Sequence, residues 1–299
     1  MREISEPVRA FALPMRPWLW LLLAACAHSA SLVPTVPREP IALTYLGVAG
    51  WQIEAAGKTI LTDPYFSRPA DANQPLVPDA TAIAAHAPAH ADLIVIGHSH
   101  FDHLLDAAEV AKRTGAELMG SLSTIRVAIA SGVPTTQLTG IAGGEDLARP
   151  GFSVRVIPSL HSMIGAADTL GEVVDSPQLP MPQAGYRAGG TFGYLFRIAG
   201  HEVLVLDTAN FVERELAGLH PEIAILAPGL RDQIRDYSCR LVHLLGDPPI
   251  VLVTHFDDWR HAPADQPPSD DVQGFVAELG RCSPQTRVIV PKHFARMTF

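Results

Sequence analysis

Four side chains that can bind a metal ion lie within six consecutive residues. Residues 92–103 read DLIVIGHSHFDH and contain His98, His100, Asp102 and His103. Residues i and i+2 of an extended segment project to the same side, so His98 and His100 can reach one point. Asp102 and His103 begin a predicted helix and can face a second point nearby. A lone histidine at a strand end is usually structural, but this cluster of nitrogen and carboxylate donors favours zinc or a similar divalent ion.

Three further candidate ligands follow the same rule, which is a His or Asp at the end of a predicted strand. They are His161 after SVRVIPSL, Asp207 at the end of EVLVLD, and His255 after IVLVT. Each alone is more often structural, but with the first cluster they would complete two metal shells. All of them lie at the carboxyl ends of strands, where ligands bind in α/β sheets. The sequence therefore predicts one site assembled from seven residues.

Short β-rich runs separated by helical patterns position these residues. We predict strands at residues 42–47, 50–54, 58–62, 92–97, 153–158, 192–198, 202–207, 222–227, 250–254 and 287–291. The first three alternate in hydrophobicity and turn tightly, which predicts antiparallel pairing. The runs 92–97, 222–227 and 250–254 are almost wholly apolar, which suits strands buried on both faces. Helical patterns occur at residues 103–114, 122–131, 210–218, 230–245 and 269–280. This order predicts an α/β domain, and the long aperiodic stretch 162–190 predicts a functional loop.

The motifs that carry the candidate ligands resemble those of a known family. Residues 98–103, HSHFDH, resemble the H-x-H-x-D-H motif of the metallo-β-lactamase superfamily. His161, Asp207 and His255 match its later motifs in order and rough spacing, and residues 60–64, ILTDP, resemble its early strand and turn. The resemblance runs from about residue 42 to the carboxyl terminus. It implies an α/β fold of the four-layer αββα sandwich type.

The same resemblance implies a cofactor of two divalent metal ions, with zinc favoured and manganese or iron as alternatives. It implies one ion held by His98, His100 and His161, and a second by Asp102, His103 and His255, with Asp207 bridging. Such a site activates water for attack on a carbonyl or phosphoryl centre. Asp102 and Asp207 are the candidate catalytic residues, because they could orient the nucleophile and relay protons. Asp63 is expected to be a structural partner near the site.

Residues 253–259 and 290–294 look most similar to one branch of the superfamily. That branch contains ascorbate-6-phosphate lactonase-like proteins and the N-acylphosphatidylethanolamine phospholipase D type. It implies a small-molecule or lipid-like substrate. Candidate substrate contacts lie in the long loop or after predicted ligands, with a surface or salt-bridging role as the alternative for each. They are Tyr186, Arg187, Trp259, Arg260, His261, Lys292 and His293.

Three other functions compete with hydrolysis of an ester, lactone or phosphodiester. A true β-lactamase does not normally carry a bridging aspartate at the position of Asp207. A flavodiiron oxidoreductase resembles H-x-E-x-D, with a glutamate where this chain has His100. A non-catalytic metal-binding lipoprotein would be expected to lose ligands, and all seven are present.

The amino terminus predicts export. Three arginines precede the apolar run 17–25, which is too short to span a bilayer, and small residues follow. Residues 23–26, LAAC, resemble the lipobox of bacterial lipoproteins, which implies acylation of Cys26; ordinary cleavage within residues 27–30 is the alternative. We predict a signal peptide over 1–26, a tether over 27–40 and a hydrolase domain over 41–299. The protein would then be periplasmic and attached to the membrane through acylated Cys26.

Composition supports a globular protein and argues against nucleic-acid binding. The 299 residues are 47% hydrophobic, enough for a sizeable core. The formal charge is −9 and the chain has no basic run, so a partner bound through its phosphates is not expected. Cys239 and Cys282 could form a disulfide in an oxidising periplasm or remain as buried free thiols.

Overall fold

The computed structural model describes residues 38–164, 169–263 and 269–299. The predicted signal peptide with Cys26, and all but the last three residues of the predicted tether, lie outside these ranges. Residues 38–40 run beside the second sheet, where Glu39 N donates to Ala199 O. Within the described ranges, none of the helices has the length and apolar character that a membrane crossing requires.

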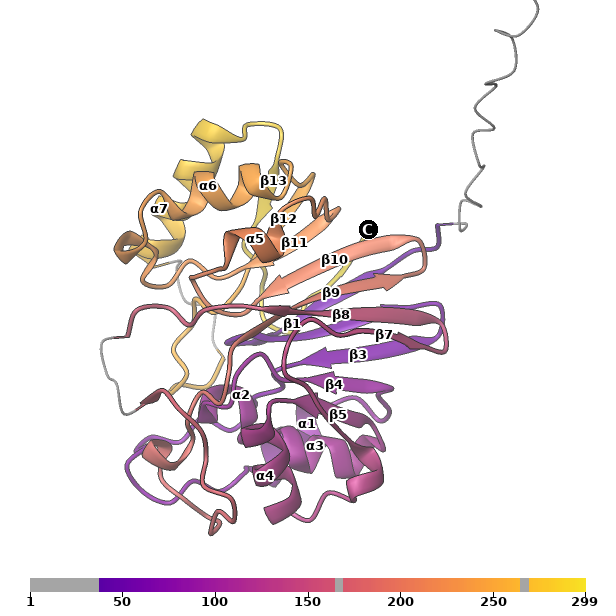
Figure 1. Ribbon diagram of the computed structural model, residues 1–299, viewed down its shortest axis with the longest axis vertical. Coiled ribbons are helices and arrows are strands. Elements are labelled where there is room, and N and C mark those ends of the chain that lie inside the picture. Colours follow the sequence, from indigo (N-terminus) through magenta and orange to yellow (C-terminus); the bar gives the residue numbers. More distant parts are fainter. Residues whose placement is uncertain (1–37, 165–168, 264–268) are drawn as a thin grey trace, which may run out of the picture. The chain divides into compact units, whose positions relative to one another are not determined.

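Two seven-stranded sheets lie at the centre of the fold (Figure 1). The first has the order β14-β1-β2-β3-β4-β5-β6, with the bounds β1 Ala42–Gly47, β2 Gly50–Ala55, β3 Lys58–Thr62, β4 Leu93–Val95, β5 Glu117–Gly120, β6 Leu138–Gly140 and β14 Arg296–Thr298. The second has the order β13-β12-β11-β10-β9-β8-β7, with the bounds β7 Asp146–Arg149, β8 Phe152–Pro158, β9 Phe192–Ile198, β10 His201–Leu206, β11 Ile223–Leu226, β12 Ile250–Val253 and β13 Arg287–Ile289.

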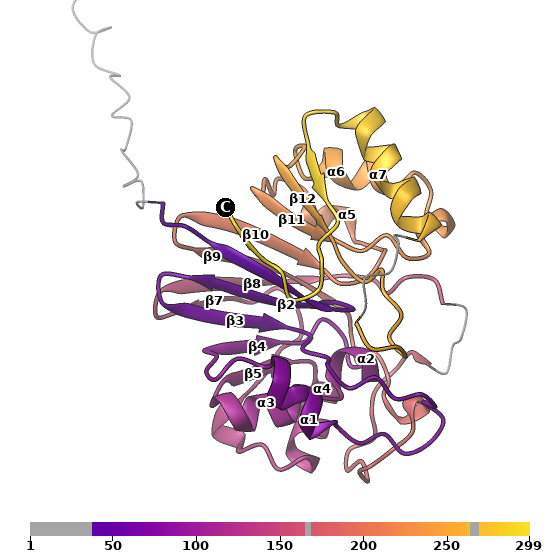
Figure 2. The ribbon, with the colours of Figure 1, turned by 180° about the vertical axis from the view of Figure 1, so that it is seen from behind.

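Helices cover the outer face of each sheet, which makes four layers. Beside the first sheet lie α1 (Ala80–His86), α2 (Phe101–Leu104), α3 (Ala107–Thr114) and α4 (Leu122–Ala130). Beside the second lie α5 (Glu213–Leu216), α6 (Tyr237–Leu244) and α7 (Asp270–Cys282). The two groups stand on opposite sides of the sheets in both views (Figures 1 and 2). The predicted αββα sandwich is confirmed.

The apolar strands are buried on both faces, as expected. Val203 and Val205 of β10 pack in the core between the two sheets, whereas Leu204 and Leu206 pack against the helices. The short strand β4 alternates in the same way and pairs in parallel with both of its neighbours. Strands β1, β2 and β3 are antiparallel, which confirms the pairing predicted for them. A continuous apolar run is therefore the signature of a middle-layer strand here.

The predicted helix over 103–114 is wrong in one respect, because it is broken into α2 and α3. Asp106 stands at the break and is fully buried. Its carboxylate accepts hydrogen bonds from Phe66 N at 2.6 Å, Ser67 N at 2.7 Å and Ser67 Oγ at 2.6 Å. A buried carboxylate needs such donors, and they fix the loop after β3 against the helix pair.

Other boundaries also differ from the predictions. The helical patterns at 210–218 and 230–245 yield only the shorter α5 and α6. Four strands and one helix were not predicted: β5, β6, β7, β14 and α1. These four strands have only three or four residues each and α1 has seven, and β7 is half exposed, so their sequences lack a strong period.

The two cysteines left open by the sequence are joined. Cys239 of α6 and Cys282 of α7 form a disulfide, with their Cα atoms 5.8 Å apart. The bond links the two helices that cover the second sheet.

The last residues of the chain return to the first sheet. Strand β14 pairs antiparallel with β1, opposite Ala42, Leu43 and Thr44. Just before it, Phe294 N donates to Tyr45 O at 2.8 Å. Strand β13, only a few residues earlier, lies at the edge of the second sheet, so the carboxyl-terminal segment passes from one sheet to the other.

Candidate metal centre

All seven predicted ligands follow strands whose carboxyl ends meet at one edge of the sandwich. His98, His100, Asp102 and His103 come after β4, His161 after β8, Asp207 after β10, and His255 after β12. The turn after β4 is fixed by Asp63, whose Oδ1 accepts from Gly97 N at 2.8 Å. The structure therefore brings together side chains that are separated by up to half of the sequence.

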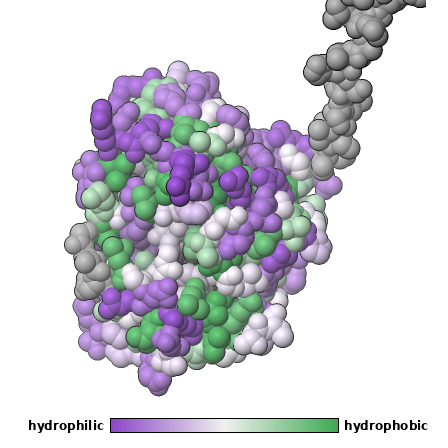
Figure 3. Space-filling model, viewed as in Figure 1, coloured by the Kyte–Doolittle hydropathy of each residue, from purple (hydrophilic) through white to green (hydrophobic). Residues whose placement is uncertain are grey.

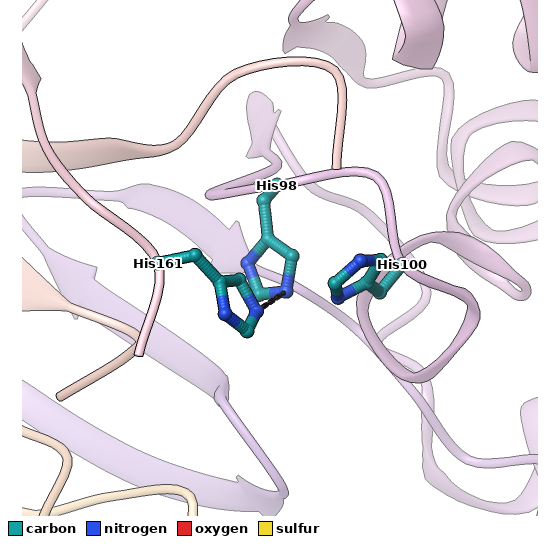
Figure 4. A group of neighbouring side chains, drawn as sticks. All are labelled: His98, His100 and His161. Atoms are coloured by element: carbon teal, nitrogen blue, oxygen red, sulfur yellow. Dashed lines mark hydrogen bonds between the residues drawn. The ribbon is translucent and has the colours of Figure 1, made fainter. Parts of the chain in front are cut away.

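The first group of converging donors is His98, His100 and His161 (Figure 4). One ring nitrogen from each lies within 4.8 Å of the other two. His98 Nε2 and His161 Nε2 are 3.1 Å apart. This is the triad that the family resemblance implies for one metal ion.

Hydrogen bonds behind this triad fix which nitrogen of each ring faces its centre. His98 Nδ1 lies 2.7 Å from Asp207 Oδ2. His100 Nε2 donates to Thr169 O at 2.9 Å, and His161 Nδ1 donates to Ser162 O at 2.9 Å. A carbonyl oxygen can only accept, so the opposite nitrogens of His100 and His161 carry lone pairs. Converging lone pairs repel one another unless a cation lies between them, so this donor set fits a divalent metal ion.

The second group is Asp102, His103 and His255. His103 Nε2 and His255 Nε2 are 3.2 Å apart, and Asp102 Oδ2 lies 3.6 Å from His255 Nε2. His255 has a φ of 50°, in the left-handed region that few residues other than glycine adopt. Its backbone N donates to Val48 O at 2.6 Å, which holds the residue in this conformation. Such backbone strain is commonly found at functional sites.

Asp207 lies between the two triads. Its Oδ2 is 2.7 Å from His98 Nδ1 and 3.4 Å from His103 Nδ1, so one carboxylate oxygen reaches a histidine of each triad. Asp63 Oδ2 also approaches His103 Nδ1, at 3.5 Å. A Cβ atom at Gly97 would collide with the Asp207 carboxylate. Asp207 thus needs a glycine beside it, and it connects the two halves of the site.

The pKa shifts of the histidines fall into two classes. Burial, followed by the charge of His103, lowers the pKa of His98 well below its usual value. Burial lowers the pKa of both His161 and His255 to about 4, which keeps their rings neutral and able to bind metal. His103 behaves oppositely. Burial lowers its pKa, but the charges of Asp102 and then Asp63 outweigh this and raise it to about 9.

Burial and neighbouring charges also shift the pKa values of the carboxylates. Burial and the neighbouring charge of Asp63 raise the pKa of Asp207 to about 8. Burial raises the pKa of Asp102, but His103 and His255 outweigh it, so this pKa is lowered and the group is ionised. Burial also raises the pKa of Asp63, so without a cation the site keeps a proton on His103 and another on the Asp63–Asp207 pair. A bound cation supplies the positive charge that these protons supply in its absence.

A buried ion pair supports the loop that carries His255, and no sequence pattern predicted it. Asp257 Oδ1 accepts from Tyr45 Oη and Val48 N, both at 2.7 Å. Asp257 Oδ2 accepts from His293 Nε2 at 3.0 Å and from Arg68 Nη2 at 3.1 Å. Burial opposes ionisation, but the His293 hydrogen bond and the Arg68 charge hold the pKa of Asp257 well below its usual range. Four separate segments of the chain are thereby joined two residues after a predicted ligand.

The triads open into a cavity of about 270 Å³. Its lining includes His98, His100, Asp102, His161, Asp207 and His255, together with Thr208, Leu230 and Trp259. Lys and Arg are absent from the described residues that line it.

Of the seven predicted substrate contacts, the structure brings Trp259 to this cavity and gives the other six different places. Tyr186 is buried in the core beneath α1–α4. Arg187 Nη1 donates to Leu170 O. Arg260 stacks over Trp259, and His261 pairs with Asp258 at 2.6 Å. Lys292 is exposed. His293 faces Asp257 behind the site, so its ring nitrogen is engaged in the supporting network.

Comparison with known proteins gives consistent matches. Residues 42–221 match the family model of the β-lactamase superfamily domain. A UPF0173 metal-dependent hydrolase from Methanopyrus kandleri is 30% identical over 245 residues, which cover 80% of this chain and 92% of that protein. Another, from Aeropyrum pernix, is 35% identical over 139 residues, which cover 42% of this chain and 53% of that protein.

Solved structures share the fold at low sequence identity. Igni18, a metallo hydrolase from Ignicoccus hospitalis, has a TM-score of 0.58 at 22% identity, over 87% of this chain and 99% of that one. The metallo-β-lactamase fold protein YhfI from Bacillus subtilis has a TM-score of 0.57 at 12% identity, over 88% of this chain and 100% of that one.

Proposed function

Since this chain is a metal-dependent hydrolase of the metallo-β-lactamase superfamily, we propose that it uses two metal ions to activate water against an ester, lactone or phosphodiester bond. The observation that carries the proposal is the pair of triads connected by Asp207. Three histidines converge in one triad and two histidines with an aspartate in the other. A single ion at either triad would leave the converging donors of the other without a cation.

The residues divide the work as their positions indicate. His98, His100 and His161 would hold one ion, and Asp102, His103 and His255 the other. Bound ions would supply the positive charge that lowers the pKa of water and stabilises an oxyanion. Asp102 is ionised and its side chain faces the cavity, so it can orient water and accept its proton. Asp207 would keep His98 and His103 aligned, and Trp259, which lines the cavity, would shield one side of it from bulk water.

Zinc is the proposed metal, because all the donors are imidazole nitrogens and carboxylate oxygens. Manganese and iron share these preferences and are the alternatives. Metal analysis of protein purified from its native compartment distinguishes them.

The enzyme is further proposed to be an exported lipoprotein. The amino-terminal signal and Cys26 motivate this location, and the Cys239–Cys282 bond supports it, because disulfides persist in oxidising compartments. Cell fractionation of wild type and Cys26→Ser tests the proposal. Release of the variant from the membrane fraction is expected, and equal distribution of the two proteins would contradict acylation.

The hydrolytic mechanism is tested by removing ligands from each triad separately. His161→Ala and His255→Ala should each lose about one of two bound ions per chain and most of the turnover of an ester, lactone and phosphodiester panel. His243→Ala is the matched control, because His243 is an exposed residue of α6 paired with Asp247. Unchanged turnover in Asp102→Ala and His103→Ala would refute the two-metal mechanism. Nitrocefin in the same panel detects β-lactamase activity.

A further inference from the structure

A second, apolar cavity adjoins the candidate metal centre. It measures about 590 Å³ and shares His161, Ser162 and Ile164 with the first cavity. A molecule whose reacting bond lies at the triads can therefore extend into the second cavity without leaving the protein surface.

The lining of this second cavity exposes large apolar side chains. Leu160 is 49% exposed, Met163 54%, Ile164 36% and Leu170 47%. Figure 3 shows hydrophobic residues on this face of the molecule, beside a pale hollow. Soluble proteins seldom leave such side chains grouped in water unless the group binds something. Here the group lies at the entrance to a predicted reaction centre.

The charges of the side chains that line the two cavities indicate which class of ligand they can bind. No Lys, Arg, Asp or Glu lies among the described residues that line the second cavity. The first cavity has two carboxylates and, in its described lining, no cationic side chain. In these linings only the metal ions of the proposed centre could meet the negative charge of a phosphodiester, whereas an uncharged ester needs no cationic side chain. The lining therefore favours a neutral reacting group attached to an apolar chain.

We propose that the substrate is a carboxylic ester or lactone with an apolar acyl chain, and that the chain lies in the cavity formed by Leu160, Met163, Ile164 and Leu170. This inference rests on the proposed hydrolytic function. In the reaction, a bond forms between the carbonyl carbon and the oxygen of water, and the bond from that carbon to the alcohol oxygen breaks. One proton of the water passes to the departing alkoxide, and the other leaves as the acid ionises.

The test is a series of p-nitrophenyl esters from acetate to decanoate with the metal-loaded full chain. We expect kcat/KM to rise with chain length, by at most about fourfold for each methylene removed from water. In the double variant Met163→Ser/Leu170→Ser, kcat/KM for decanoate should fall at least about tenfold while that for acetate changes less than about twofold. Leu122→Ser/Ile129→Ser is the control, because both residues are 51% exposed on α4.

The possible outcomes distinguish a failure of the acyl-chain site from a failure of the proposed hydrolytic function. Turnover that is equal for acetate and decanoate would overturn the acyl site and leave the hydrolase intact. If no ester is cleaved, calorimetric titration with butyrate and decanoate tests whether the second cavity binds an apolar chain. The two ligands share the same carboxylate and differ only in chain length. Decanoate should bind at least about tenfold more tightly in the wild type and lose this advantage in the double variant, and equal affinities would overturn the inference.

A membrane is the competing explanation for the exposed apolar side chains. Flotation with vesicles of phosphatidylethanolamine and phosphatidylglycerol measures membrane binding by the wild type and both double variants. If Met163→Ser/Leu170→Ser lost vesicle binding and kept the chain-length preference, the surface would be a membrane contact and the acyl site would be refuted.

Discussion

Replacing Arg68 by methionine should destabilise the loop that carries His255. The Arg68 and Asp257 side chains are only 5% and 7% exposed, so the pair is almost fully desolvated. Methionine fills a similar volume but leaves the Asp257 carboxylate without its cation. Breaking a buried ion pair in this way costs about 3–5 kcal/mol. The variant also loses the hydrogen bond from Arg68 Nη1 to Asp258 O.

The free energy of unfolding in urea measures this loss, and metal analysis measures its effect on the site. We expect the variant to bind about one ion instead of two, because His255 lies two residues before Asp257. Arg214→Met is the control, since this arginine is 85% exposed and should change stability by less than about 0.5 kcal/mol. If Arg68→Met does not fold, Arg68→Lys keeps the charge and loses part of the hydrogen bonding, and should show a smaller deficit of the same kind.

The stability lost in Arg68→Met should depend on pH in a definite direction. The pKa of Asp257 is depressed in the folded protein, so its stabilisation is present above the unfolded pKa of about 3.9 and is lost as the pH falls. In Arg68→Met the folded pKa of Asp257 rises, so the deficit should be largest near neutral pH and shrink in acid. A loss below about 1 kcal/mol at pH 7, together with full metal occupancy, would refute the role assigned to the ion pair.

Three further predictions concern the centre and its scaffold. In metal-free protein, the raised pKa values of His103 and Asp207 mean that the folded state binds more protons than the unfolded one. Its Tm should therefore fall between pH 6.5 and 9, and His103 alone should contribute about 3 kcal/mol to this loss of stability. The Tm of zinc-loaded protein should change little over the same range, and a Tm that rises without metal would contradict the assignment. Removing the disulfide with Cys239→Ser/Cys282→Ser should lower the free energy of unfolding by about 4 kcal/mol for a sequence separation of 43 residues, as measured in urea against wild type with and without reductant; equal stabilities would show that the bond is dispensable. Gly97→Ala should keep the circular dichroism of wild type but lose metal, because the added methyl group displaces Asp207, and full metal content would place Asp207 outside the centre.

The layers of the fold were predictable because a strand that is buried on both faces has an unbroken apolar sequence. Strands of the middle layers face one core with odd residues and another with even ones, so β10 and β12 read as unbroken apolar runs. The edge strands β6, β7 and β14 have no such constraint and were not predicted. The helix break at Asp106 depends on donors from Phe66 and Ser67, which local sequence periodicity does not reveal.

The candidate ligands were predictable for a related reason, since each follows an apolar strand that fixes its place. The residues around them were not. Arg68 and Asp257 are separated by most of the chain, and nothing in their local sequence pairs them. Tyr186 and His293 have polar atoms that suit substrate binding, but in the fold one is buried beneath helices and the other faces Asp257. Apolar residues such as Met163 and Leu170 resemble ordinary core residues until their exposure is known.

The pairing of β14 with β1 sets an order on how this enzyme can be made. During synthesis β1 emerges first, but its outer edge has no partner until the last residues of the chain are available. His293, which secures Asp257, is also made near the end. The His255 loop therefore reaches its final arrangement only after residues 293–298 have been made, and a contact between residues so far apart in the sequence is among the slowest to form. A chain without residues 293–298 would expose the open edge of β1 and leave Asp257 without its His293 partner, so it should be more susceptible to proteolysis than the chain that has them.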